Sequence, residues 1–166
     1  PNRNIRAQAA EWHRAAMQKA YGARPELPDA TMLDSMLYFM FPQCGFWACE
    51  TLPFTYQFTP HASDPGQSYF EVRMLLPIPT DRPCPPPAPV IEIEPHERVF
   101  DKAPGFAFLG YVFDQDMSNM PLIQQGVTAA DPTAHHTQLG RYQEMIVQHW
   151  NERIDALVKG QKPSLK

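Results

Sequence analysis

Ser68-Tyr-Phe-Glu-Val-Arg-Met-Leu-Leu76 is the stretch of sequence that decides the fold class. Apolar side chains occupy alternate positions, which is the period of a β-strand with one buried face. The expected buried side consists of Phe70, Val72, Met74 and Leu76. Glu71 and Arg73 then point to the solvent-facing side, because successive side chains of a strand alternate between its two faces. A half-buried strand is therefore predicted here.

Three further runs with strand composition precede this stretch, and Pro and Gly residues separate them. They comprise residues 37–41, 46–50 and 54–59. The turn Asp64-Pro65-Gly66 joins the last run to the alternating stretch. Short strands with short connections usually pair with their neighbours in the sequence, so an antiparallel meander is predicted.

The N-terminal segment has the period of an amphipathic helix. Its apolar residues recur at steps of three and four, at Ile5, Ala9, Trp12, Ala16 and Ala20. Asn2 or Asn4 is a suitable N-cap and Gly22 a suitable stop, because Asn favours the first position of a helix and Gly the position after its end. We expect one helix that buries this apolar stripe.

A longer helix is predicted near the other end of the chain, over residues 139–158. Its apolar stripe consists of Tyr142, Ile146, His149 or Trp150, Ile154 and Leu157. We expect Trp150 and Ile154 to face the sheet, and a shorter helix to begin at Asp116. Strands in a meander followed by a long helix that covers them indicate an α+β fold class.

The length of 166 residues suits one domain with an apolar core, so residues 1–166 are expected to form a single domain. Residues 77–89 are rich in proline, which favours an extended surface connector over a strand or helix. A polyproline II ligand for a partner domain is the alternative for this segment.

The composition also indicates which partners the protein can bind and in which cellular compartment it lies. The net charge of −4, without a cluster of Lys and Arg, argues against nucleic acid and anionic membranes as partners. No apolar run reaches the roughly 18 to 20 residues that a membrane span requires. Cys44, Cys49 and Cys84 are odd in number and lack CxxC spacing, which favours reduced thiols and a cytoplasmic protein.

Four stretches of the sequence are informative together, because of the order in which they follow one another along the chain. The most informative is Phe113-Asp-Gln-Asp-Met-Ser-Asn-Met-Pro-Leu-Ile-Gln-Gln-Gly126, and the others are Tyr38-Phe-Met-Phe-Pro-Gln43, residues 56–72 and residues 139–150. The pattern resembles the α subunits of Rieske-type aromatic-ring-hydroxylating dioxygenases, in which an acidic iron ligand is followed by a Gln and a Gly. Asp116, Gln124 and Gly126 occupy those places. The resemblance covers residues 37–158 apart from the proline-rich segment.

This resemblance implies a helix-grip form of the α+β fold, in which an antiparallel sheet wraps around the long C-terminal helix beside an apolar cavity. It also implies a mononuclear Fe(II) held by two histidines and one carboxylate, with Asp116 as the carboxylate. The parent enzyme would take electrons from a reductase through a Rieske 2Fe-2S cluster and insert dioxygen into an aromatic or other apolar substrate. The candidate pocket-lining residues are Phe41, Phe106, Val112 and Phe113.

Parts of the family's pattern are missing from this chain. No pair of histidines at ligand spacing precedes Asp116, the cluster-binding Cys-x-His and Cys-x-x-His pairs are absent, and Gln43 replaces the usual Asn. We therefore expect the chain to be the C-terminal part of the catalytic domain. The histidine ligands and the Rieske cluster would then lie in an N-terminal part of the oxygenase, and this chain alone would lack most of the iron chemistry.

Other interpretations stay open beside the oxygenase. Asp116 can serve as an ordinary helix cap, and the adjacent His135 and His136 fit an exposed loop better than a metal site. The whole chain can be a non-catalytic helix-grip domain that binds an apolar small molecule, or can have a structural role in an assembly. A homo-oligomer is compatible with each of these functions.

Overall fold

The computed structural model describes residues 4–75, 83–84, 86–131, 133 and 137–161. These residues group into two compact units, one formed by residues 1–84 together with 140–166 and the other by residues 85–139. Each unit is described by itself below, and the expectation of a single domain stays a prediction. Residues 77–82 and 85 of the predicted connector lie outside the described residues, and the rest of it contains neither helix nor strand.

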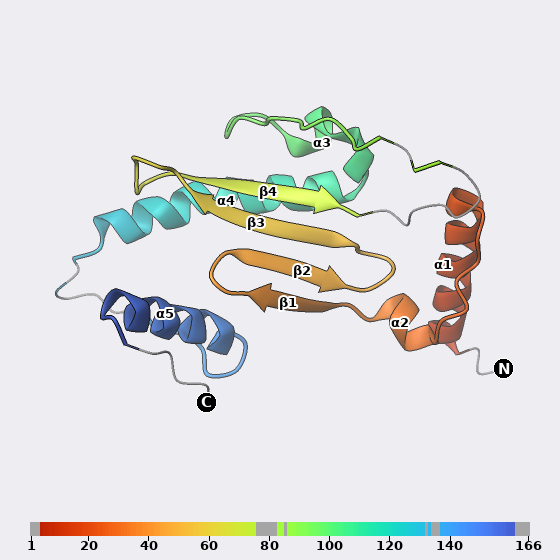
Figure 1. Cartoon of the computed structure of the whole chain (residues 1–166), viewed down its shortest axis with the longest axis horizontal. Coiled ribbons are helices and arrows are strands. Elements are labelled where there is room, and N and C mark those ends of the chain that lie inside the picture. Colours follow the sequence, from red (N-terminus) through yellow and green to blue (C-terminus); the bar gives the residue numbers. More distant parts are fainter. Residues whose placement is uncertain (1–3, 76–82, 85, 132, 134–136, 162–166) are drawn as a thin grey trace. The chain divides into compact units, whose positions relative to one another are not determined.

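The first unit contains a four-stranded antiparallel sheet in the order β1-β2-β3-β4 (Figure 1). Its strands are β1 (Met36–Met40), β2 (Cys44–Ala48), β3 (Phe54–Pro60) and β4 (Ser68–Met74). Each strand pairs with its neighbour in the sequence. The predicted antiparallel meander is therefore confirmed, and with the helices it gives the α+β class.

The register of the strands collects large apolar side chains on one side of the sheet, which we call the apolar face. It carries Leu37, Phe39, Trp47, Phe54, Tyr56, Phe58, Phe70, Val72 and Met74. The rings of Phe58 and Phe70 stack at 4.8 Å between centroids, and Phe54 is buried. Glu71 and Arg73 are exposed on the opposite face, as the alternation predicts, and Phe70 and Val72 are half-buried. Met74 was expected to be buried but is 36% exposed, and Leu76 lies outside the described residues.

The predicted N-terminal helix forms as α1 (Ile5–Tyr21). The Asn4 side chain accepts a hydrogen bond from the Ala7 amide at 3.3 Å, and Gly22 closes the helix with a φ of 79°. The helix, its cap and its stop are thus confirmed. Left-handed backbone at Gly22 costs little because glycine has no Cβ.

The face that α1 buries differs from the expected stripe. Ile5 is 80% exposed and Trp12 is 69% exposed, whereas Ala10 is fully buried. The helix packs against α2 (Asp29–Leu33), and the Arg14 guanidinium donates hydrogen bonds to the Leu27 carbonyl at 2.6 Å and to Asp29 at 2.7 Å. Charge-assisted hydrogen bonds of this kind are shorter and stronger than neutral ones, so they contribute to the orientation of the helix. The apolar period alone therefore predicted the wrong face.

The second unit contains α3 (Val99–Lys102), the 3₁₀ helix η1 (Pro104–Phe106) and α4 (Leu109–Ala129). α3 and α4 pack closely at Gly110, where an added Cβ would lie 2.7 Å from the Phe100 Cα atom. That separation is too short for any side chain, so only glycine fits without movement of the backbone. The long C-terminal helix is α5 (Met145–Val158) in the first unit; it begins six residues later than expected, since residues 141–144 form a turn.

Gly110→Ala should destabilise the protein by about 1–3 kcal/mol, because the methyl group forces α3 and α4 apart. Gly126→Ala is the matched control on the same helix, since a Cβ at Gly126 meets nothing within 4 Å. The control should gain up to about 1 kcal/mol from better helix propensity. Denaturant unfolding measures both changes, and equal effects at the two glycines would contradict the close α3–α4 contact.

Candidate functional site

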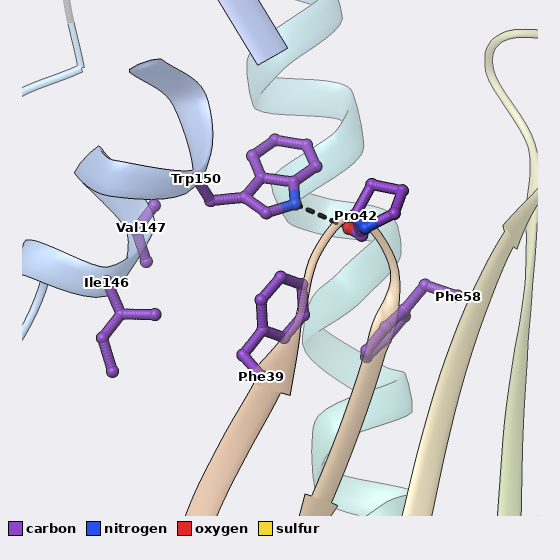
Figure 2. Close-up of a pocket in the computed structure, with 6 residues that line it drawn as sticks. All are labelled: Phe39, Pro42, Phe58, Ile146, Val147 and Trp150. Atoms are coloured by element: carbon purple, nitrogen blue, oxygen red, sulfur yellow. Dashed lines mark hydrogen bonds between the residues drawn. The ribbon is translucent and has the colours of Figure 1, made fainter. Parts of the chain in front are cut away.

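An apolar pocket of about 230 Å³ lies between the sheet and α5 of the first unit (Figure 2). The sheet contributes the rings of Phe39 and Phe58 together with Pro42 from the β1–β2 turn. Helix α5 contributes Ile146, Val147 and Trp150. Its lining therefore comes from two segments about one hundred residues apart in the sequence.

The two sides of the pocket are positioned by different features of the sequence. Phe39 and Phe58 point the same way because the register places both on the apolar face. Ile146 and Trp150 are four residues apart, so they lie on one side of the helix. The indole Nε1–H of Trp150 donates a hydrogen bond to the Pro42 carbonyl at 2.7 Å, which joins α5 to the turn (Figure 2).

The chemistry of the pocket is apolar throughout. Its one side-chain polar group is the indole N–H of Trp150, and that group already donates to the Pro42 carbonyl. The lining remains partly open to solvent, with Phe39 39% exposed and Val147 47% exposed. An apolar ligand would cover this surface without leaving a polar group unsatisfied, whereas a charged ligand would find no partner.

The predicted pocket residues lie elsewhere. Phe41 is in the β1–β2 turn, next to Pro42 in the sequence, but it does not line this pocket. Phe106 and Phe113 belong to the second unit, where their rings meet edge to face at 5.3 Å, and Phe113 is buried. Val112 is 39% exposed on the same helix as Phe113. A ligand-binding role for these four residues stays a prediction.

Asp116 lies in the second turn of α4, whose first residue is Leu109. The expectation that this carboxylate opens or caps a helix is therefore wrong, and α4, with 21 residues, is longer than the 14-residue α5 and not shorter. The apolar run before it is itself helical, because Leu109, Gly110 and Phe113 supply the side of α4 that packs on neighbouring segments. The Asp116 side chain is exposed, and no hydrogen bond or ion pair to it is found among the described residues.

The neighbouring Asp114 has the structural role instead. Its carboxylate accepts hydrogen bonds from the Val99 amide at 2.5 Å, at the start of α3, and from the Arg98 guanidinium at 3.3 Å. Arg98 also lies over the Phe100 and Tyr111 rings, which stack at 3.8 Å between centroids. The sequence gives little sign of this cap, because the Asp is fifteen residues away from the helix that it caps.

The described residues hold no group of three His, Cys, Asp or Glu side chains that could bind a metal ion. His135 and His136 lie outside the part of the chain that the structure describes. Asp116 alone does not form a facial iron site, so the described residues by themselves do not fit the iron that the resemblance implies.

Comparison with protein-family models, with curated proteins and with solved structures gives no match for this chain. Among the described helices, none has the length and apolar character needed to cross a membrane. The function must therefore be argued from the side chains that the structure brings together.

Asp114→Ala should cost about 0.5–2 kcal/mol of stability, because the first amide of α3 loses its side-chain cap. Asp116→Ala is the matched control two residues along the same helix, and it should change stability by less than about 0.5 kcal/mol, as exposed sites usually do. Thermal or denaturant unfolding gives both values. A larger loss at Asp116 than at Asp114 would reverse the roles assigned to the two carboxylates.

Proposed function

We propose that the chain binds an aromatic or other apolar small molecule in the pocket between the apolar face and α5. The observation that carries this proposal is the lining itself, which consists of six apolar or aromatic residues from two elements. Binding sites for small molecules are usually concave and lined mainly by such side chains.

The size of the pocket limits the ligand class. An apolar protein cavity of roughly 150 Å³ can hold benzene, so a pocket of about 230 Å³ suits a ligand of one or two fused rings. Removing roughly 200 Å² of apolar surface from water contributes about 5 kcal/mol. The loss of translational and rotational freedom opposes this gain, so dissociation constants in the millimolar to micromolar range are expected.

We further propose that this binding unit is the C-terminal part of the catalytic domain of a ring-hydroxylating oxygenase with the helix-grip fold. The support is the order of the four family-like stretches, together with an antiparallel sheet that is followed by a long helix and has an apolar pocket beside it. An oxygenase of this type needs such a pocket for its aromatic substrate. The parent protein would then supply the Rieske cluster and accept electrons from a reductase.

An iron site would need further ligands from outside the described residues. Asp116 is suited to be one ligand, because its carboxylate is exposed and unpaired among the described residues. When bound, Fe(II) would activate dioxygen, and Asp116 would contribute one anionic oxygen ligand to it. The non-catalytic alternative requires the pocket alone, which makes ligand binding the more direct test of the two proposals.

Val147→Asp should weaken binding of naphthalene at least tenfold, because it places a carboxylate against an apolar ligand. The matched control is Val158→Asp on the same helix, where Val158 is 81% exposed and does not line the pocket. Saturation-transfer NMR with naphthalene measures both affinities. If the wild-type protein shows no binding, or if both variants lose it equally, the pocket is not the binding site.

The oxygenase proposal is tested by metal analysis. After incubation with Fe(II), the purified chain should hold much less than one iron per molecule, because a single carboxylate without histidine partners is a weak ligand set. In the complete oxygenase, Asp116→Ala should abolish both iron binding and product formation. Stoichiometric iron bound by three ligands of this chain, or normal turnover of the Asp116 variant, would contradict the proposal.

A further inference from the structure

Strand β1 is an edge strand without a charged residue. β2 pairs with one side of it, and among residues 4–75 and the other described segments no strand pairs with the opposite side (Figure 1). All five side chains from Met36 to Met40 are exposed, and so is Phe41 beside them. Backbone N–H and C=O groups along such an edge are free to pair with another strand.

The two edges of the sheet differ in how they are protected. Strand β4, at the other edge, carries Glu71 and Arg73, whose side chains form an ion pair at 2.6 Å. Charged residues on an edge strand discourage pairing with another chain, because pairing would bury them. β1 lacks this protection, although it is the more apolar of the two edges.

We propose that two copies of the chain pair through β1 in antiparallel orientation, which closes a two-fold symmetric dimer with a continuous eight-stranded sheet. With the axis at Tyr38, the Tyr38 side chains of the two copies lie opposite each other. Leu37 of one copy then faces Phe39 of the other on the apolar face, and Met36 faces Met40 on the opposite face. Apolar and aromatic cross-strand pairs of this kind stabilise antiparallel sheets.

The exposed area at this edge is near what a specific dimer needs. If each side chain has roughly 200 Å² of surface, the exposed fractions of 39–59% from Met36 to Phe41 leave on the order of 600 Å² open. A specific interface buries roughly 800 Å² per partner. Strand pairing covers part of this side-chain area, because it comes from both faces of the sheet, and the pairing of the backbone edges adds main-chain surface to it.

The charged residues near β1 do not oppose the symmetric pairing of two copies of the chain. Asp34, just before the strand, is neutralised by two hydrogen bonds of 2.8 Å from the Arg6 guanidinium. The other end of β1 continues into Phe41 and Pro42 without any charge. Among the described residues that flank β1 in the sequence, two-fold pairing therefore brings no unpaired like charges together, and this proposal does not depend on ligand binding in the pocket.

The test is sedimentation velocity of the purified chain over a range of concentrations. Wild-type protein should sediment as a dimer, and Tyr38→Lys should raise the dimer dissociation constant at least tenfold, because two ammonium groups would face each other across the axis. Tyr69→Lys is the matched control, since Tyr69 is an exposed tyrosine on the other edge strand. That variant should remain a dimer.

Circular dichroism of each variant establishes that it is folded. Should Tyr38→Lys fail to fold, Tyr38→Cys decides, because residues opposite each other in an antiparallel pair have Cα atoms about 4.5–5.5 Å apart, within disulfide range. Cys84 carries an exposed thiol, so this test uses a Cys84→Ser background. Mild oxidation should then cross-link the Tyr38→Cys variant into dimers and leave the Cys84→Ser parent uncross-linked. A wild-type monomer at roughly 100 µM, above the micromolar end of specific interfaces, would overturn the proposal. The proposal would also be contradicted if Tyr38→Lys left the dimer dissociation constant unchanged, if the chain formed an open series of larger assemblies, or if Tyr38→Cys did not cross-link.

Discussion

The hydrogen bond from the Trp150 indole to the Pro42 carbonyl is the interaction on which the candidate site depends. It spans 108 positions of the sequence and joins α5 to the turn between the first two strands. The helix and the turn that it joins each contribute residues to the pocket. A backbone carbonyl in a tight turn is a well-fixed acceptor, since its position follows from the register of β1 and β2. One indole N–H thus links the β1–β2 hairpin to the helix on the other side of the candidate pocket.

The sheet contributes to the site through its period of two. Alternation in each strand and the register between strands place Phe39 and Phe58 on the same face, although they lie on β1 and β3. Residues of the same face that do not line this pocket, such as Phe54 and Phe70, pack against other side chains of the first unit. The apolar face therefore contributes both to the packing of the first unit and to the lining of the candidate pocket.

Local signals in the sequence predicted most of the secondary structure of the first unit, but they did not predict α2, and α5 begins six residues later than expected. The alternation at Phe70 and Val72 predicted β4, and Asn4 and Gly22 predicted both ends of α1. Each of these signals depends on residues within one turn or one strand. The face of α1 could not be found in this way, because its orientation depends on hydrogen bonds from Arg14 to a segment more than ten residues away.

The candidate site was less accessible to sequence reasoning for the same physical reason. Trp150 was expected to face the sheet, and it does so in the pocket, while Ile154 is half-buried. The role of Asp114 at the start of α3 depends on how α3 and α4 pack together. The spacing of apolar residues in the sequence does not predict that packing. Asp116 was singled out by a family-like motif, and its place within α4 neither supplies a cap nor assembles a metal site from the described residues.

The central claim is that an aromatic ligand binds where Trp150, Phe39 and Phe58 meet. The most direct test is isotope-filtered NMR of the labelled protein with unlabelled naphthalene. Nuclear Overhauser effects from naphthalene to the Trp150 indole N–H and to the rings of Phe39 and Phe58 are the predicted result. Effects confined to Phe106 and Phe113, or no intermolecular effects at all, would contradict the claim.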